Sequence, residues 1–198
     1  MLTPELLQEI NNGLDFDGFM EQWHRKDSLP MKGLDAISRR YRFYSRYNLE
    51  RQARVDTLWN PSEAFTSAVQ HAPGPSTWMV ITDDWCIDSA YSMPLLKWAT
   101  DQRSDITLKI LLKDDHPELH DQFLRFDRRA IPTWAGISEQ GEVQFVWGPQ
   151  PEAIRLIRKI LIDCGAEGSL VSATTVDWYA DNGWLEVEKE MTEVLMSL

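Results

Sequence analysis

One cysteine stands where thiol chemistry could occur, at the junction between a predicted strand and a predicted helix. Residues 85–89 read Trp-Cys-Ile-Asp-Ser and follow the short apolar run 78–81. A cysteine in the first turn of a helix faces unpaired backbone N–H groups, which favour the thiolate and lower the pKa of the thiol. The sequence therefore predicts that Cys86 is a nucleophile.

The position that would complete a Cys-x-x-Cys pair holds a serine. Because Ser89 supplies a hydroxyl and not a sulfur, a mixed disulfide on Cys86 would have no neighbouring thiol to resolve it. The Ser89 hydroxyl can still donate a hydrogen bond to the thiolate, and a separate thiol could resolve the adduct. Asp88 opposes the thiolate, since a nearby carboxylate disfavours a second negative charge. Cys86, Ser89 and Asp88 are the predicted catalytic residues of a monothiol site.

The elements that would position this site follow Pro73, Gly74 and Pro75, which end a helical pattern. Short apolar runs then alternate with helical segments, as in a β-α-β unit with parallel strands. We predict, in order, a strand at 77–82, a helix from about 86 to 100, a strand at 106–112, a helical turn near 117–124, strands at about 133–138 and 143–147, and a helix at 151–163.

The segments on either side of this unit are predicted to be helical. Helix-start signals occur at Thr3, Asp15, Asp35 and Asn60, each followed by apolar residues at helical spacing. The tail also carries apolar residues at helical intervals, with an interruption at 182–183, and predicts one terminal helix with a weak point there.

Three features at matching positions resemble the thioredoxin superfamily. They are the Trp85-Cys86 pair, Pro94 inside the following helix, and Ile131-Pro132-Thr133 at the start of a strand. The resemblance implies an α/β, thioredoxin-like fold, with a central mixed β-sheet flanked by helices, over residues 62–164. Residues 1–61 and 165–198 are then helical extensions, packed with this region into one structural domain.

The same resemblance assigns residues to substrate binding. It implies that the Ile131–Pro132 bond is cis and that the backbone of Ile131 lies beside Cys86, where a thiol-bearing substrate could pair with it as an added strand. Trp85, Ile131, Pro132 and Thr133 are the predicted substrate-binding residues, and the expected partners are protein or low-molecular-weight thiols. An ordinary trans proline at the start of a strand is the alternative.

Two further positions bear on the chemistry. Thioredoxins usually carry a buried acid six residues before the reactive cysteine, where this chain has Val80, so efficient dithiol reduction is not expected. Asp83 and Asp84 are predicted to cap and orient the turn. In the resembled fold Cys164 would lie at the pole opposite the site, as a packed thiol at a helix end, beyond disulfide reach.

Composition excludes some functions. The chain has 198 residues and a net charge of −11, which disfavours nucleic acid and anionic membrane surfaces, and it lacks an apolar run long enough for a membrane span. The arginines and aromatics of residues 39–54 are therefore interpreted as a packed helix, not as a nucleic-acid stripe. The start of the sequence lacks the pattern of a secretory signal, so we expect a cytoplasmic protein.

His116 and His120 have the spacing of metal ligands, but a solvated helix start is the favoured interpretation. No metal or cofactor is predicted.

Two classes of function remain. The first is a monothiol thiol-disulfide oxidoreductase of thioredoxin-like fold that works through Cys86. The alternative is a non-catalytic binding or regulatory module of the same fold, in which the flanking aromatic-rich helices contact a partner.

Overall fold

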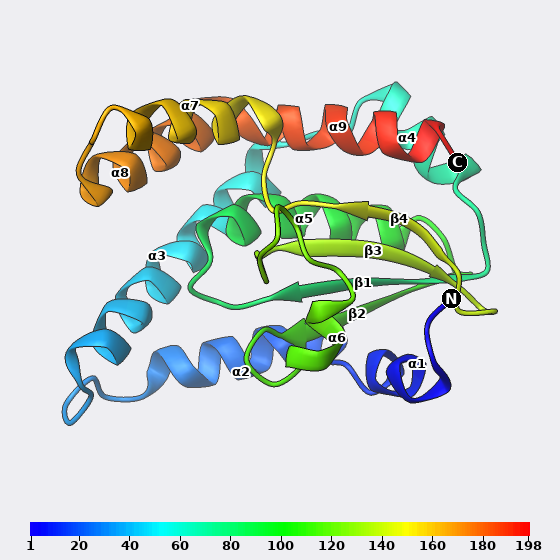
Figure 1. Ribbon diagram of the computed structural model, residues 1–198, viewed down its shortest axis with the longest axis horizontal. Coiled ribbons are helices and arrows are strands. Elements are labelled where there is room, and N and C mark those ends of the chain that lie inside the picture. The colour runs from blue at the N-terminus through cyan, green and yellow to red at the C-terminus, as the bar shows by residue number, and fades with distance from the viewer.

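The computed structural model describes residues 1–198 as helices packed around one small sheet (Figure 1). The strands are β1 (Ser76–Thr82), β2 (Ile106–Leu112), β3 (Thr133–Ser138) and β4 (Val143–Trp147). The helices are α1 (Pro4–Asn11), α2 (Phe16–Ser28), α3 (Ala36–Leu58), α4 (Glu63–His71), α5 (Ile87–Asp101), α6 (Pro117–Asp121), α7 (Glu152–Asp163), α8 (Gly168–Trp178) and α9 (Trp184–Met196), with a π-helical turn at Tyr179–Gly183.

The sheet is mixed, in the order β2-β1-β3-β4. β1 pairs with β2 in parallel, while β3 is antiparallel to both β1 and β4. β1 is a central strand and is buried at nearly every position, as its unbroken apolar run requires. The predicted α/β fold, a mixed sheet flanked by helices with additional helices at both ends, is confirmed.

The two faces of the sheet have different cores. Trp78, Val80 and Trp134 point to one face and join the larger core cluster, to which α3, α4, α5 and α9 contribute. Met79 and Ile81 point to the other face and pack with residues of α1 and α6. Successive residues of β1 alternate between the clusters because side chains of a strand point to opposite faces. The sheet is thereby fixed between two layers (Figure 1).

The N-terminal helices begin where the sequence predicts. The side chains of Thr3, Asp15, Asp35 and Ser62 each accept a hydrogen bond from a backbone N–H of the first turn that follows. Such caps satisfy donors that have no partner inside the helix.

The tail differs from the single helix predicted for it. α8 and α9 are separated by the π-helical turn, in which Asn182 has a φ of 65°. Asparagine tolerates this left-handed backbone, which is why the chain turns at the predicted weak point. α9 lies over the sheet, whereas α7 and α8 form a hairpin that extends past the end of β1 (Figure 1). The tail therefore contains one helix that completes the core and one that does not.

The main core cluster includes Val55 of α3 and Val187 of α9 as well as residues of the predicted thioredoxin-like region. The division of the chain at residues 61 and 164 stays a prediction. None of the helices combines the length and the apolar character that crossing a bilayer would require.

Glu188 links α9 to the start of α4. One carboxylate oxygen accepts the indole N–H of Trp59 and the other accepts the backbone N–H of Ser62 at 3.0 Å. Substituting Glu188→Ala leaves the buried indole N–H of Trp59 without a partner, removes the bond to the Ser62 N–H, and is expected to lower the free energy of unfolding by about 2 kcal/mol. Urea denaturation measures this loss. The matched variant Glu186→Ala, on the exposed side of α9, should cost less than about 0.5 kcal/mol, and equal losses would contradict this role of Glu188.

Candidate functional site

Cys86 lies at the point where β1 has ended and α5 begins. It is the N-cap residue of α5, and no side chain caps that helix. The thiol is largely buried, with 6% of the residue exposed, and Sγ donates to the backbone oxygen of Ile131 at 3.4 Å. The Ile131–Pro132 peptide bond is cis and directly precedes β3. The strand end, the helix start and residue 131 therefore meet at one sulfur atom.

The turn before Cys86 is held by the N-terminal helices. Asn48 of α3 donates to the backbone oxygen of Asp84 at 2.9 Å, and Lys26 of α2 forms an ion pair with the Asp84 carboxylate at 2.6 Å. Trp85 stacks on Tyr41 of α3, with 4.7 Å between ring centroids. The two helices thus position the two residues that precede the thiol.

Ser89 lies close to the sulfur. It is buried one turn into α5 and accepts a hydrogen bond from the Thr82 hydroxyl at 2.6 Å. Because its oxygen accepts from Thr82, its own proton is free to be donated to the sulfur, and this interaction lowers the pKa of Cys86.

The net shift of the Cys86 pKa is opposite to our prediction. Burial is the main cause and the charge of Asp88 is the second, and together they raise the pKa to about 12. The Ser89 hydroxyl and the backbone N–H groups of residues 88 and 89 oppose this shift but do not cancel it. The prediction of a lowered pKa considered the helix terminus and not desolvation, which disfavours a charged sulfur more strongly.

Asp88 is a buried carboxylate with two partners. Its exposed fraction is 7%, Tyr179 donates its hydroxyl proton to Oδ1 at 3.0 Å, and Arg158 lies 3.6 Å from Oδ2. Burial raises the pKa of Asp88 to about 6, although Arg158 and Tyr179 stabilise its charged form. The carboxylate beside Cys86 therefore titrates close to neutral pH.

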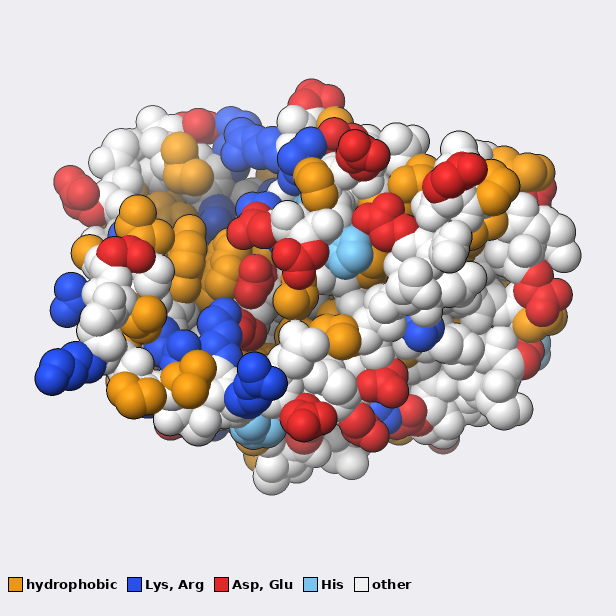
Figure 2. Space-filling view, turned by 90° about the horizontal axis from the view of Figure 1, so that it is seen from below, with side chains coloured by type: hydrophobic (Ala, Val, Ile, Leu, Met, Phe, Trp, Pro, Cys, Tyr) orange, Lys and Arg blue, Asp and Glu red, His pale blue; other side chains and the backbone are white.

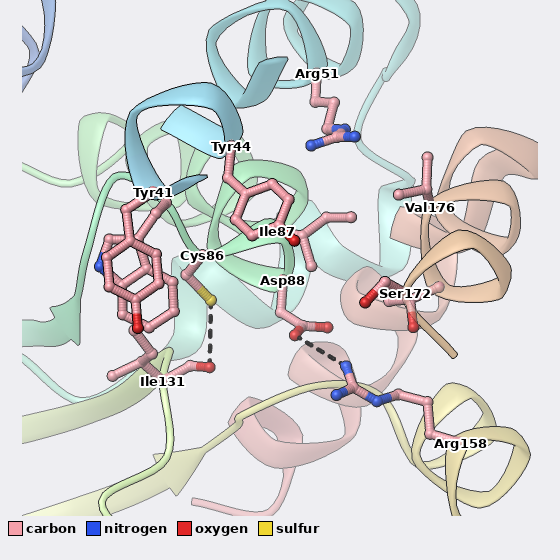
Figure 3. A pocket seen from close by; sticks show the side chains of 12 residues that line it. Tyr41, Tyr44, Arg51, Cys86, Ile87, Asp88, Ile131, Arg158, Ser172 and Val176 are labelled. Atoms are coloured by element: carbon pink, nitrogen blue, oxygen red, sulfur yellow. Dashed lines mark hydrogen bonds and ion pairs between the residues drawn. The ribbon is translucent and has the colours of Figure 1, made fainter. Parts of the chain in front are cut away.

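A cavity of about 330 Å³ opens beside Cys86. Figure 3 shows side chains from α3, the start of α5 and the α7–α8 hairpin converging on it. Figure 2 shows a hollow at the left of the molecule whose walls carry hydrophobic side chains, with lysine or arginine above and below it and aspartate or glutamate along its right edge. The cavity is lined by Tyr41, Tyr44, Arg51, Trp85, Cys86, Ile87, Asp88, Ile131, Arg158, Ser172, Thr175 and Val176.

The predicted site residues do not all reach this cavity. Four of them line it (Cys86, Asp88, Trp85 and Ile131), but Ser89, Pro132 and Thr133 do not. The Thr133 hydroxyl instead donates to the backbone oxygen of Ala130 at 2.7 Å. Thr133 therefore helps to fix the loop that carries Ile131.

Sequence reasoning missed the cavity residues that α3 and the α7–α8 hairpin supply. Tyr41, Tyr44 and Arg51 belong to the arginine- and tyrosine-rich segment that we interpreted as a packed helix. Tyr41 and Tyr44 remain partly exposed, at 37% and 38%. Those aromatics were a signal of a binding surface. Arg158 gave no such signal, because arginine is common on an amphipathic helix.

Cys164 is exposed and unpaired, so the expectation of a packed thiol is wrong. It follows α7, which extends outward from the end of the sheet that carries the site and not towards the opposite pole (Figure 1). Only Ile154 of α7 is buried, because the helix packs against α8 and not on the sheet. The thioredoxin-based expectation for this helix therefore does not hold.

The two histidines have separate partners. His116 Nδ1 lies 2.7 Å from a carboxylate oxygen of Glu9, and His120 Nε2 lies 3.0 Å from the backbone oxygen of Ala130. No group of three or more histidine, cysteine, aspartate or glutamate side chains in the structure could hold a metal ion.

In a comparison with protein families, the family model for thioredoxin matches residues 36–161. This chain belongs to the thioredoxin family. The match includes the sheet, α5 and α3, the helix that holds the turn before Cys86.

Two solved structures are similar to this family member over 100% of its chain and 99% of theirs. One is a protein of unknown function from Pseudomonas aeruginosa, with a TM-score of 0.60, and the other is an HIV epitope-scaffold, with a TM-score of 0.63. Each is 18% identical to this chain, so the likeness concerns the fold. Comparison with curated proteins finds no match.

Substituting Asp88→Asn should lower the pKa of Cys86. The amide removes a negative charge that raises the Cys86 pKa and can still accept the Tyr179 hydroxyl. We therefore expect the ultraviolet absorbance of the Cys86 thiolate to appear about one pH unit lower than without the substitution, with Cys164→Ser as the background. Asp101→Asn, at the exposed far end of α5, is the matched control. An unchanged or higher pKa of Cys86 in the Asp88 variant would contradict the electrostatic account.

Proposed function

We propose that this thioredoxin-family protein exchanges thiols and disulfides through Cys86 alone. The observation that supports the proposal most is the placement of one sulfur at the start of α5, facing the Ile131 carbonyl and opening onto a cavity. Protein thiols or low-molecular-weight thiols are the proposed partners. Cys86 and Cys164 are both unpaired, which suits a cytoplasmic, reducing environment.

The proposed reaction has two balanced steps. The Cys86 thiolate attacks one sulfur of a substrate disulfide, that S–S bond breaks, and the other sulfur leaves as a thiolate with the electron pair. The product is a mixed disulfide on Cys86. A second thiolate then attacks the substrate sulfur of this adduct, which forms a new disulfide and releases the Cys86 thiolate. Ser89 cannot replace that second thiolate, because it has no sulfur.

Proton transfer must accompany the first step, because a pKa of about 12 keeps Cys86 protonated at neutral pH. Asp88 is the proposed proton acceptor, because its pKa of about 6 is closer to neutral pH than the pKa of Cys86 is. The Ser89 hydroxyl and the N–H groups of the first turn of α5 would stabilise the sulfur once it is charged. The negative charge would then move from the Asp88 carboxylate to the Cys86 sulfur as the proton moves from Cys86 to Asp88.

A non-catalytic binding module of the same fold is the second candidate. The burial of Cys86 and its raised pKa favour this candidate, because neither is typical of a reactive cysteine. In that case the cavity would bind a partner or ligand, and Cys86 would be an inert part of its wall.

Treatment of the folded, reduced Cys164→Ser variant with 2-hydroxyethyl disulfide distinguishes the candidates. We expect one adduct, located at Cys86 by mass spectrometry, which an added small thiol releases. The rate of exchange between disulfide and thiol should exceed the uncatalysed rate and should fall to that rate in Cys86→Ser. If the adduct forms only after unfolding by urea, Cys86 is inert in the fold and the binding module is correct.

The fate of the adduct tests the monothiol part of the proposal. In a Ser89→Cys variant the new thiol stands one helical turn from Cys86 and should expel the adduct, leaving an internal disulfide. Ser92→Cys places a buried thiol a further turn along α5 and should leave the adduct in place. An adduct that persists in Ser89→Cys would contradict the proposed geometry.

A further inference from the structure

We infer that the cavity beside Cys86 selects small thiols and disulfides that carry a carboxylate group. The inference rests on the proposed thiol chemistry and names the class of substrate. It comes from Arg51 of α3 and Arg158 of α7, two cations that line the same cavity as the reactive sulfur (Figure 3).

The charge of Arg51 is not neutralised by any carboxylate. Its guanidinium forms no ion pair, donates to the side-chain oxygen of Asn48 at 2.7 Å, and lies 5.8 Å from the centroid of the Tyr47 ring. An arginine guanidinium has five N–H donors, so its hydrogen bonds to Asn48 and to the Tyr91 hydroxyl leave others free. Arg51 is therefore oriented by its neighbours and still able to bind an anion.

Arg158 is only loosely paired. It donates to the side-chain oxygen of Gln150 at 3.1 Å, whereas its distance to Asp88 Oδ2, 3.6 Å, exceeds that of a hydrogen bond. A third of its side chain is exposed. Its remaining donors can form the paired hydrogen bonds that a carboxylate accepts from arginine.

The balance of charge in the cavity is opposite to that of the whole chain. Its lining residues include two arginines and one carboxylate, Asp88, whereas the chain has a net charge of −11. The positive charge of the cavity attracts an anion, whereas the rest of the negatively charged surface repels anions. An anion is therefore drawn to this cavity in preference to other parts of the surface.

The size of the cavity favours a small molecule. A volume of about 330 Å³ lies near the lower end of the range for small-ligand sites. Tyr41 and Tyr44 supply an apolar wall across the cavity from Arg158 (Figure 3), which suits the carbon chain of a small thiol. The occupant we infer places its sulfur at Cys86 and a carboxylate at one of the two arginines, which lie at separate ends of the cavity.

Three disulfides of similar size and different charge test the inference: dithiodiglycolate, 2-hydroxyethyl disulfide and cystamine. The readout is the ratio of the rates at which the anionic and the cationic disulfide modify Cys86 in the Cys164→Ser variant. A ratio is used because a change in the amount of thiolate alters both rates equally. Cys164 in the Cys86→Ser variant provides the reference ratio, since it reports the field of the whole molecule on an exposed thiol.

We expect the ratio at Cys86 to exceed the reference by about tenfold at low ionic strength. Arg51→Gln and Arg158→Gln should each lower it at least about threefold, whereas Arg40→Gln, on the exposed surface of α3, should leave it unchanged. A ratio equal to the reference, or one that neither cavity variant lowers, would overturn the inference while leaving the thiol chemistry intact. If none of the three disulfides modifies Cys86 in the folded protein, the proposed function itself fails.

Discussion

The burial of one sulfur atom at the start of α5 is the constraint on which the rest of the site depends. The backbone there offers N–H groups that favour a thiolate, but the surrounding structure removes the water that a charged sulfur needs. Desolvation has the larger effect, and Asp88 adds to it, so the pKa of Cys86 rises to about 12. A protein built in this way keeps its thiol protonated until a substrate or a proton acceptor changes the local charge.

Helices from both ends of the chain pack around the site. α3 holds the turn before Cys86 through Asn48 and covers Trp85 with Tyr41. The turn between α8 and α9 places Tyr179 against Asp88, while α7 supplies Arg158. These helices also form the walls of the cavity, so the same elements set the access to Cys86 and the charge around it. The site therefore depends on helices from both ends of the chain as well as on the sheet and α5.

The thioredoxin-like region was predictable because its signals are local. The apolar run of β1, the glycine-containing loop between β3 and β4, and the capping residues of the first helices each specify an element from a few neighbouring residues. The position of Cys86 followed from its place between the run and the helix. The fold class and the nucleophile candidate thus required no knowledge of distant contacts.

The remainder depends on contacts that no short pattern encodes. Arg158 reaches Asp88 because α7 extends past the end of the sheet. α9 lies over the sheet because the chain turns at Asn182, which has a left-handed backbone conformation. The pKa of Cys86 depends on how deeply these elements bury it, which the sequence around residue 86 does not determine. For the same reason Cys164 was expected to be packed but is exposed.

The ultraviolet absorbance of the thiolate, followed against pH, tests the central claim of a protonated resting thiol most directly. The sample is the folded Cys164→Ser variant, and the same variant with Cys86→Ser added is subtracted to remove the tyrosine signal. We predict no thiolate below about pH 10, as a pKa of about 12 requires. A thiolate that appears with a pKa below about 8.5, the ordinary value for cysteine, would contradict the account.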